Sequence, residues 1–153
     1  MIRELHLADE AATLALGQRL GAVAQAGDVI ALHGTLGAGK TCLARGFAAG
    51  ADVIDLRSVN SPTFALWNIH PGRVVMHHVD LYRLGDADEI MALGLEEVVG
   101  LEGVCLIEWP SRAPDILPED TLHVTLTADG DGRRARLEAH GERSVRYLEA
   151  VAP

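Results

Sequence analysis

One short stretch constrains the fold of this chain most: GTLGAGKT, at positions 34–41. It follows an apolar run at residues 29–32, typical of a strand buried on both faces, and precedes a helical pattern from about Lys40 to Ala49. The stretch fits G-x-x-x-x-G-K-[ST] at every fixed position, in the strand–loop–helix context that this pattern requires. It therefore predicts a phosphate-binding loop rather than a glycine-rich turn without a ligand.

Each fixed residue type of this loop has a chemical reason. Glycines let the backbone curl so that successive N–H groups point at phosphate oxygens, and the following helix aims its positive dipole end at the same place. We expect these backbone contacts from Leu36, Gly37, Ala38 and Gly39. Lys40, the chain's single lysine, reaches the β- and γ-phosphates in a space that the planar fork of an arginine would not fit. The Thr41 hydroxyl can bind Mg²⁺.

Two carboxylates follow apolar strand patterns further along the chain. Asp80 ends VVMHHVD and Glu108 ends VCLIE, so both reach the edge where the loop opens if their strands run parallel to the first. Either acid can hold the metal ion, while the other orients or activates an attacking water. Alternatively, one of them only forms an ion pair, with Arg83 or Arg112, which leaves open whether both are essential.

Two further motifs lie near this predicted edge. In NSPTF, Thr63 can touch the γ-phosphate or the metal, as an ordered switch residue does, although a plain turn before an edge strand also explains the motif. His77 and His78 are neighbours on a strand and so point to opposite faces. That arrangement is wrong for joint metal binding, and we interpret both as structural.

The remaining patterns predict an α/β fold. We expect an edge strand at residues 2–7, a helix from the Asp9 cap to about Ala26, two strands within 63–69 and 73–82, a helical segment within 85–99, a strand at 103–110, a hairpin within 121–140 and a last short helix. The length of 153 residues fits one domain. The order of elements predicts a single three-layer domain, residues 1–153, of the P-loop NTPase type, with a central mixed, partly parallel sheet.

Composition limits the partners and the compartment. The formal net charge is −9, and a domain that holds nucleic acid by itself usually shows a basic face, so we expect any work on RNA to go through a protein partner. The N-terminus shows no export signal and no stretch is long enough to span a membrane. Cys42 and Cys105 follow no metal or redox spacing, which favours reduced thiols in a cytoplasmic protein.

Several motifs together resemble the TsaE (YjeE) family: GTLGAGKT, SPTF, HHVDLYRL, LGLEE and CLIEWP, in this order. The resemblance runs from about Glu10 to the tail hairpin. It implies a cytoplasmic P-loop ATPase that uses ATP and Mg²⁺ in bacterial tRNA threonylcarbamoyladenosine biosynthesis. The implied partners are TsaB and TsaD, with tRNA reached only through the complex.

The resemblance also assigns residues. It implies phosphate and Mg²⁺ contacts for Lys40 and Thr41, a metal-site role for Glu108, and places Asp80 and Thr63 on the family's strand-end acid and switch-like threonine. Glu10 and Arg133 match positions near the nucleotide base. The family usually has Asp where this chain has Thr35. An Asp there can assist the water or the metal, so Thr35 lowers the hydrolysis rate that the resemblance implies. Cys42 replaces a usual Thr.

Three functional classes compete for this chain. The ATPase of a tRNA-modifying complex is favoured, with weak activity alone and stimulation by partners. A small-molecule kinase is the alternative, but it needs an arginine-bearing lid, and the interval 112–121 is short and poor in charge. A GTP-dependent switch needs an Asn-Lys-x-Asp loop, whereas the single lysine already belongs to the phosphate loop. Stoichiometry and oligomeric state stay open.

Overall fold

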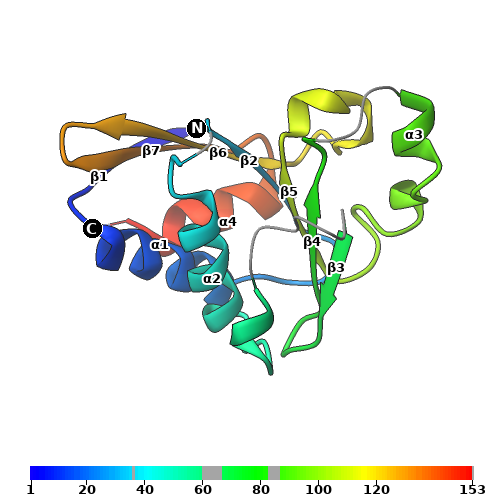
Figure 1. The fold of residues 1–153 in the computed structure, drawn as a ribbon, viewed down its shortest axis with the longest axis horizontal. Helices are drawn as coiled ribbons and strands as arrows, with labels where there is room; N and C mark the ends of the chain where they lie inside the picture. The colour runs from blue at the N-terminus through cyan, green and yellow to red at the C-terminus, as the bar shows by residue number, and fades with distance from the viewer. Residues whose placement is uncertain (36, 60–66, 83–86, 153) are drawn as a thin grey trace.

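The computed structural model describes residues 1–35, 37–59, 67–82 and 87–152. Its main helices and strands follow one another along the chain (Figure 1): β1 Ile2–Leu7, α1 Glu10–Ala22, β2 Val29–His33, α2 Lys40–Gly50, β3 Trp67–His70, β4 Met76–Asp80, α3 Ala87–Met91, β5 Val104–Glu108, β6 Leu122–Asp129, β7 Gly132–Glu138 and α4 Glu142–Ala150. Four short 3₁₀ turns lie among the described residues, namely η1 Leu56–Ser58, η2 Leu95–Glu97, η3 Pro110–Arg112 and η4 Pro114–Ile116.

The strands form one mixed sheet in the order β1-β7-β6-β2-β5-β4-β3. Strands β6, β2, β5 and β4 are mutually parallel, whereas β3 pairs with β4, β7 with β6 and β1 with β7 in the antiparallel sense. The predicted mixed, partly parallel sheet is therefore confirmed. β1 is the edge strand that its alternating sequence indicates.

Helical elements cover both faces of the sheet, so the predicted three-layer fold is confirmed. Helices α1, α2 and α4 lie on one face (Figure 1), where Leu20, Phe47 and Tyr147 pack on the sheet. On the other face, α3 and η2 cover β4 and β5, with Ile90 and Leu95 in the core. The side chains of β5 alternate between these two cores, as the period of a strand requires.

Two predicted helices are shorter than their sequence patterns. α1 ends at Ala22 rather than near Ala26. The Arg73 guanidinium binds carbonyl oxygens that the helix end leaves free, donating to Gly21 O at 2.7 Å and, just beyond the helix, to Ala24 O at 2.9 Å. The segment expected to be helical within 85–99 is divided into α3 and η2 by Gly94, whose φ of 75° is left-handed. Residues 85 and 86, at the start of that expected segment, lie outside the described residues.

A buried carboxylate anchors the last helix. Asp28, in the turn before β2, is 1% exposed and accepts hydrogen bonds from Tyr147 Oη (2.6 Å), Arg143 Nη1 (3.1 Å), the Gln25 amide (2.9 Å) and Arg146. A buried charge needs such a complete set of partners. Asp28 therefore ties α4 to the turn that leads into the strand before the glycine-rich loop.

Helices α1 and α2 meet backbone against backbone. Each contributes two glycines four residues apart, which places each pair on one helix face: Gly17 and Gly21, and Gly46 and Gly50. A Cβ at any of these positions would come within 3.0 Å of backbone atoms of the opposite helix. This contact fixes the first helix of the chain directly on the helix that follows the loop.

We predict that Gly46→Ala destabilises the protein, because the added methyl group would push against the backbone of Leu14 and force the helices apart. Overpacking of this kind costs about 1–3 kcal/mol. Urea denaturation followed by circular dichroism measures the free energy of unfolding. Ala15→Ser, on the exposed side of α1, is the control and should change it by no more than about 0.5 kcal/mol. Equal stability of Gly46→Ala and the wild type would contradict the close contact.

Candidate active site

The glycine-rich loop joins β2 to α2 with the backbone that the motif predicts. Gly37 and Gly39 have φ values of 80° and 103°, the left-handed region that side chains disfavour, and Gly39 is the N-cap of α2. The Ala38 amide donates to Thr35 O at 3.1 Å, which closes a tight turn. Leu36, expected to contribute a backbone contact, lies outside the described residues. The loop thus curls over the positive end of α2, and Thr41 follows in the first turn of that helix.

Lys40 is buried, yet its ammonium has no hydrogen-bond acceptor among the described residues. The side chain is 6% exposed, and its Nζ lies 4.0 Å from Glu108 Oε1 and 4.1 Å from the centre of the Trp109 ring. Burial lowers the pKa of Lys40, while the nearby Glu108 and Asp80 carboxylates oppose that shift. A desolvated cation with unused donors at the start of a helix fits a phosphate group.

The two strand-end acids lie side by side. β4 and β5 are parallel and in a register that pairs Asp80 with Glu108, and β5 in turn pairs Glu108 with Leu32, just before the loop. Glu108 is 3% exposed and contacts His78 through Oε2, 2.6 Å from Nε2. Asp80 Oδ1 accepts from the Tyr82 amide at 2.9 Å. Desolvation raises the pKa of Asp80, and the neighbouring Glu108 carboxylate adds to the rise.

The carboxylates of Asp80 and Glu108 and the hydroxyl of Thr41 supply the kind of oxygen ligand that suits Mg²⁺. Magnesium prefers oxygen ligands and keeps several waters, so it needs only one or two protein groups beside phosphate oxygens. Among the described residues, no group of three or more His, Cys, Asp and Glu side chains is arranged to hold a metal ion.

A second part of the site lies on the α1 side of the loop. A pocket of about 150 Å³ is lined by Leu7, Asp9, Glu10, Thr13, Gly37, Gly39, Cys42, Asp131, Gly132 and Arg133. Asp9 caps α1 as predicted, by accepting from the Ala12 amide, and Glu10 begins the helix beside the loop. The structure thus brings Glu10 and Arg133, from opposite ends of the chain, to one pocket next to the loop.

Arg133 also holds the loop itself. Its Nε donates to Ala38 O at 3.1 Å and its Nη2 to Gly37 O at 3.2 Å. A guanidinium on these carbonyl oxygens favours the backbone orientation in which the peptide N–H groups point away from it. The family resemblance places Arg133 near a base, and no local sequence pattern indicates its contacts with Gly37 O and Ala38 O, about a hundred residues earlier in the chain.

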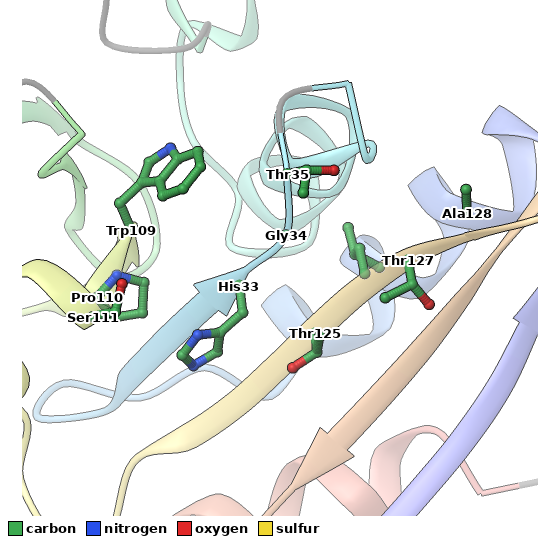
Figure 2. A pocket seen from close by; sticks show the side chains of 10 residues that line it. His33, Gly34, Thr35, Trp109, Pro110, Ser111, Thr125, Thr127 and Ala128 are labelled. Carbon is green, nitrogen blue, oxygen red and sulfur yellow. The ribbon is translucent and has the colours of Figure 1, made fainter.

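Trp109 covers the other side of Lys40. Its φ of 57° is left-handed, its ring also contacts Tyr82 with 4.8 Å between ring centres, and it helps to line a cavity of about 380 Å³. Figure 2 shows this cavity, with Trp109 and Pro110 on one side and Thr125 and Thr127 of β6 on the other, below Thr35 of the loop. None of the sequence motifs indicates this cavity.

Thr63 and Arg83 lie outside the described residues. His77 and His78 point to opposite faces of β4 as predicted: His77 Nδ1 accepts from Trp67 Nε1 at 3.0 Å, whereas His78 reaches Glu108. Both cysteines are free, and burial raises the pKa of Cys105 to about 12. No helix in the described ranges is long and apolar enough to cross a membrane.

Comparison with known proteins agrees with this architecture. Residues 7–136 match the family model described as "Threonylcarbamoyl adenosine biosynthesis protein TsaE". Curated relatives named tRNA threonylcarbamoyladenosine biosynthesis protein TsaE include those of Treponema pallidum, 38% identical over 77% of this chain and 86% of the relative, and of Nostoc sp., 41% identical over 86% of this chain and 82% of the relative.

A solved structure shows the same fold. The crystal structure of Bacillus subtilis YdiB matches with a TM-score of 0.78 and 30% identity, and the match covers 97% of this chain and 94% of that one. The resemblance stated from the motifs is therefore confirmed. With the loop, the paired acids and the pocket beside α1 in one arrangement, this chain belongs to the TsaE family of threonylcarbamoyl adenosine biosynthesis proteins.

Proposed function

We propose that the protein is a Mg²⁺-dependent ATPase, the ATP-binding and hydrolysing component of the machinery that makes threonylcarbamoyladenosine beside the anticodon of tRNA. One observation carries the ATPase part: the buried Lys40 ammonium, at the loop that precedes α2, has unused hydrogen-bond donors and faces Glu108 at 4.0 Å. The pathway rests on the family, whose curated members carry that name. A cytoplasmic location follows from the same assignment.

The phosphates of ATP would lie on the loop. Amides of residues 36–39 and the start of α2 would donate to them, and Lys40 would neutralise charge on the β- and γ-phosphates. Mg²⁺, held by Thr41 and by Glu108 or Asp80, would supply positive charge to the same phosphate oxygens. The second carboxylate would orient the water that attacks the γ-phosphorus, with Thr63 contributing from its own segment. The pocket with Glu10 and Arg133 would take the base.

Partners are part of this proposal. The net charge of −9 gives the chain little attraction for the phosphate backbone of tRNA, so tRNA would be reached through a complex with TsaD and TsaB. Hydrolysis by a bare P-loop domain tends to be slow because the water is poorly placed. A partner that orders the segment around Thr63 would improve that placement.

A small-molecule kinase is the alternative function, and the cavity beside Trp109 is where its second substrate would bind (Figure 2). A phosphoryl acceptor bound there would lie next to the loop. The cavity lining brings no arginine or lysine that would shield a transferred phosphoryl group from water. Assays should therefore compare ATP hydrolysis with and without a panel of hydroxyl-bearing acceptors, and a phosphorylated product would favour the kinase.

We predict that Lys40→Ala weakens ATP binding by about 10- to 100-fold, because it removes charge-assisted hydrogen bonds to phosphate. The fold should survive, since the lysine charge is desolvated and not hydrogen-bonded within the described residues. Isothermal titration calorimetry gives Kd, and circular dichroism checks folding. Arg19→Ala, which removes a positive charge from an exposed position of α1, should leave Kd unchanged. Wild-type affinity in a folded Lys40→Ala protein would contradict the phosphate role.

We predict that Glu108→Gln lowers the kcat of Mg²⁺-dependent hydrolysis about 100-fold or more, with a smaller effect on nucleotide affinity, because a metal-site acid acts mainly on developing charge. Asp80→Asn should behave in the same way. Phosphate release measured at saturating ATP gives kcat. Glu97→Gln on η2 is the exposed control. If both site variants hydrolyse ATP at the wild-type rate, the metal site lies elsewhere.

We predict weak ATPase activity of the isolated protein, stimulation by the TsaB–TsaD pair, and loss of that stimulation in Thr63→Ala. Hydrolysis and complex formation should be measured side by side, with proteins from one source. Thr35, where the family usually has Asp, makes fast turnover of the isolated chain still less expected. Two results would count against this model: fast hydrolysis that the partners do not increase, or tight tRNA binding by the isolated chain at physiological salt.

A further inference from the structure

His78 is a buried histidine with one polar contact in the part of the chain that the structure describes. It is 0% exposed, and its Nε2 lies 2.6 Å from Glu108 Oε2, a charge-assisted hydrogen bond of short length. Its other ring nitrogen, Nδ1, is buried and has no hydrogen-bond partner among the described residues. Since a carboxylate oxygen can only accept, Nε2 carries the hydrogen and donates to Glu108.

The surroundings of His78 do not otherwise require a histidine. In the β4–β5 register His78 pairs with Leu106, and Met76 lies two residues earlier on the same face, in the core under α2. An apolar side chain of similar size would satisfy this packing without leaving Nδ1 unsatisfied. The one contact that uses the imidazole chemistry is the contact with Glu108.

The hydrogen bond makes the two oxygens of Glu108 unequal. Oε2 is occupied by His78, and Oε1 is the oxygen that faces Lys40, at 4.0 Å. Without the bond, the terminal torsion of a glutamate is broad and nearly two-fold, so the carboxylate would sample other orientations. His78 thus holds the carboxylate with one oxygen turned toward the loop.

We propose that His78 is a positioning residue that acts through Glu108: it donates Nε2–H to Oε2 and so presents Oε1 to the metal and phosphate side of the site. This inference rests on the proposed ATPase function. Groups that orient a metal-binding side chain typically contribute 10- to 100-fold to metal affinity or activity, so the effect should be large enough to measure.

The test compares two amides that differ in reach. The side-chain nitrogen of Gln lies near the place of the histidine Nε2 and can donate to Glu108, whereas that of Asn lies near the place of Nδ1 and cannot. His78→Asn should raise the Mg²⁺ concentration that half-saturates hydrolysis, or lower kcat, by about 10- to 100-fold. His78→Gln should recover most of this loss. Equal behaviour of the two variants would overturn the proposal.

Binding supplies a readout that does not depend on turnover. Affinity for ADP, measured by calorimetry, should be nearly wild-type in His78→Asn when Mg²⁺ is removed with a chelator. The gain in affinity on adding Mg²⁺ should shrink in His78→Asn and be retained in His78→Gln. A loss of ADP affinity that is the same with and without Mg²⁺ would show a general packing defect and overturn the positioning role.

His77 offers a matched control. It lies on the same strand, is also buried, and hydrogen-bonds Trp67 on the opposite face, away from Glu108. His77→Asn should lower stability to a similar extent, as thermal unfolding would show, without changing the Mg²⁺ dependence. If His77→Asn changes the Mg²⁺ dependence as much as His78→Asn, the effect comes from the strand and the proposal fails.

A double-mutant cycle separates this inference from the function it rests on. If His78 acts only through Glu108, then His78→Asn should add less than about a two-fold loss in a Glu108→Gln background. A full additional loss there would overturn the inference while leaving the ATPase intact. If Glu108→Gln itself keeps the wild-type rate, the proposed metal site is wrong, and the inference falls with it.

Discussion

The backbone contact between α1 and α2 is the constraint on which the site's geometry depends. Glycines on both helices let them approach until an added methyl group would meet main-chain atoms within 3.0 Å. α1 begins at Glu10, which lines one side of the 150 Å³ pocket, and α2 begins at Lys40, directly after the loop that lines the other. Because interiors are close-packed and not easily compressed, this contact fixes the distance between the two helix starts.

Arg133, on β7, connects the sheet to the glycine-rich loop that precedes α2. Its guanidinium binds Gly37 O and Ala38 O, so β7, the loop and α2 hold one another in place. β7 in turn pairs with β1, which leads directly into α1. The first and last parts of the chain therefore flank the loop, and the pocket that holds Glu10 and Arg133 lies at their junction.

How far the sequence predicts this structure depends on how local each feature is. Strands β2 and β5, the hairpin β6–β7 and the loop follow from apolar runs, turn residues and glycine spacing within a few residues, and all are found. The order of the sheet, with β6 inserted beside β2, depends on pairings between distant segments that no local pattern specifies. The contacts at the end of α1 are equally non-local, since Arg73 lies about fifty residues further along the chain.

The site divides in the same way. Asp80 and Glu108 were predicted to meet because each ends a strand, and parallel strands bring their carboxyl ends to one edge. The contact between His78 and Glu108 is not predicted, because the interpretation of His77 and His78 considers only joint metal binding and not a hydrogen bond to the neighbouring strand. His78 lies two residues before Asp80 and so shares its face of β4, and the register that pairs Asp80 with Glu108 brings the Glu108 carboxylate to that same face. The two glycines four residues apart in each helix are a second sequence pattern, and it is typical of a close helix–helix contact.

The Lys40 ammonium contacts two consecutive residues at the end of β5. It lies over the Trp109 ring and near Glu108, and both interactions stabilise its charge in a dry environment. A desolvated cation–π contact contributes about 2 kcal/mol, and an ion pair at 4.0 Å without a direct hydrogen bond leaves the ammonium donors unused. A phosphate group would offer charge-assisted hydrogen bonds to those donors, at about 1.5–3 kcal/mol each.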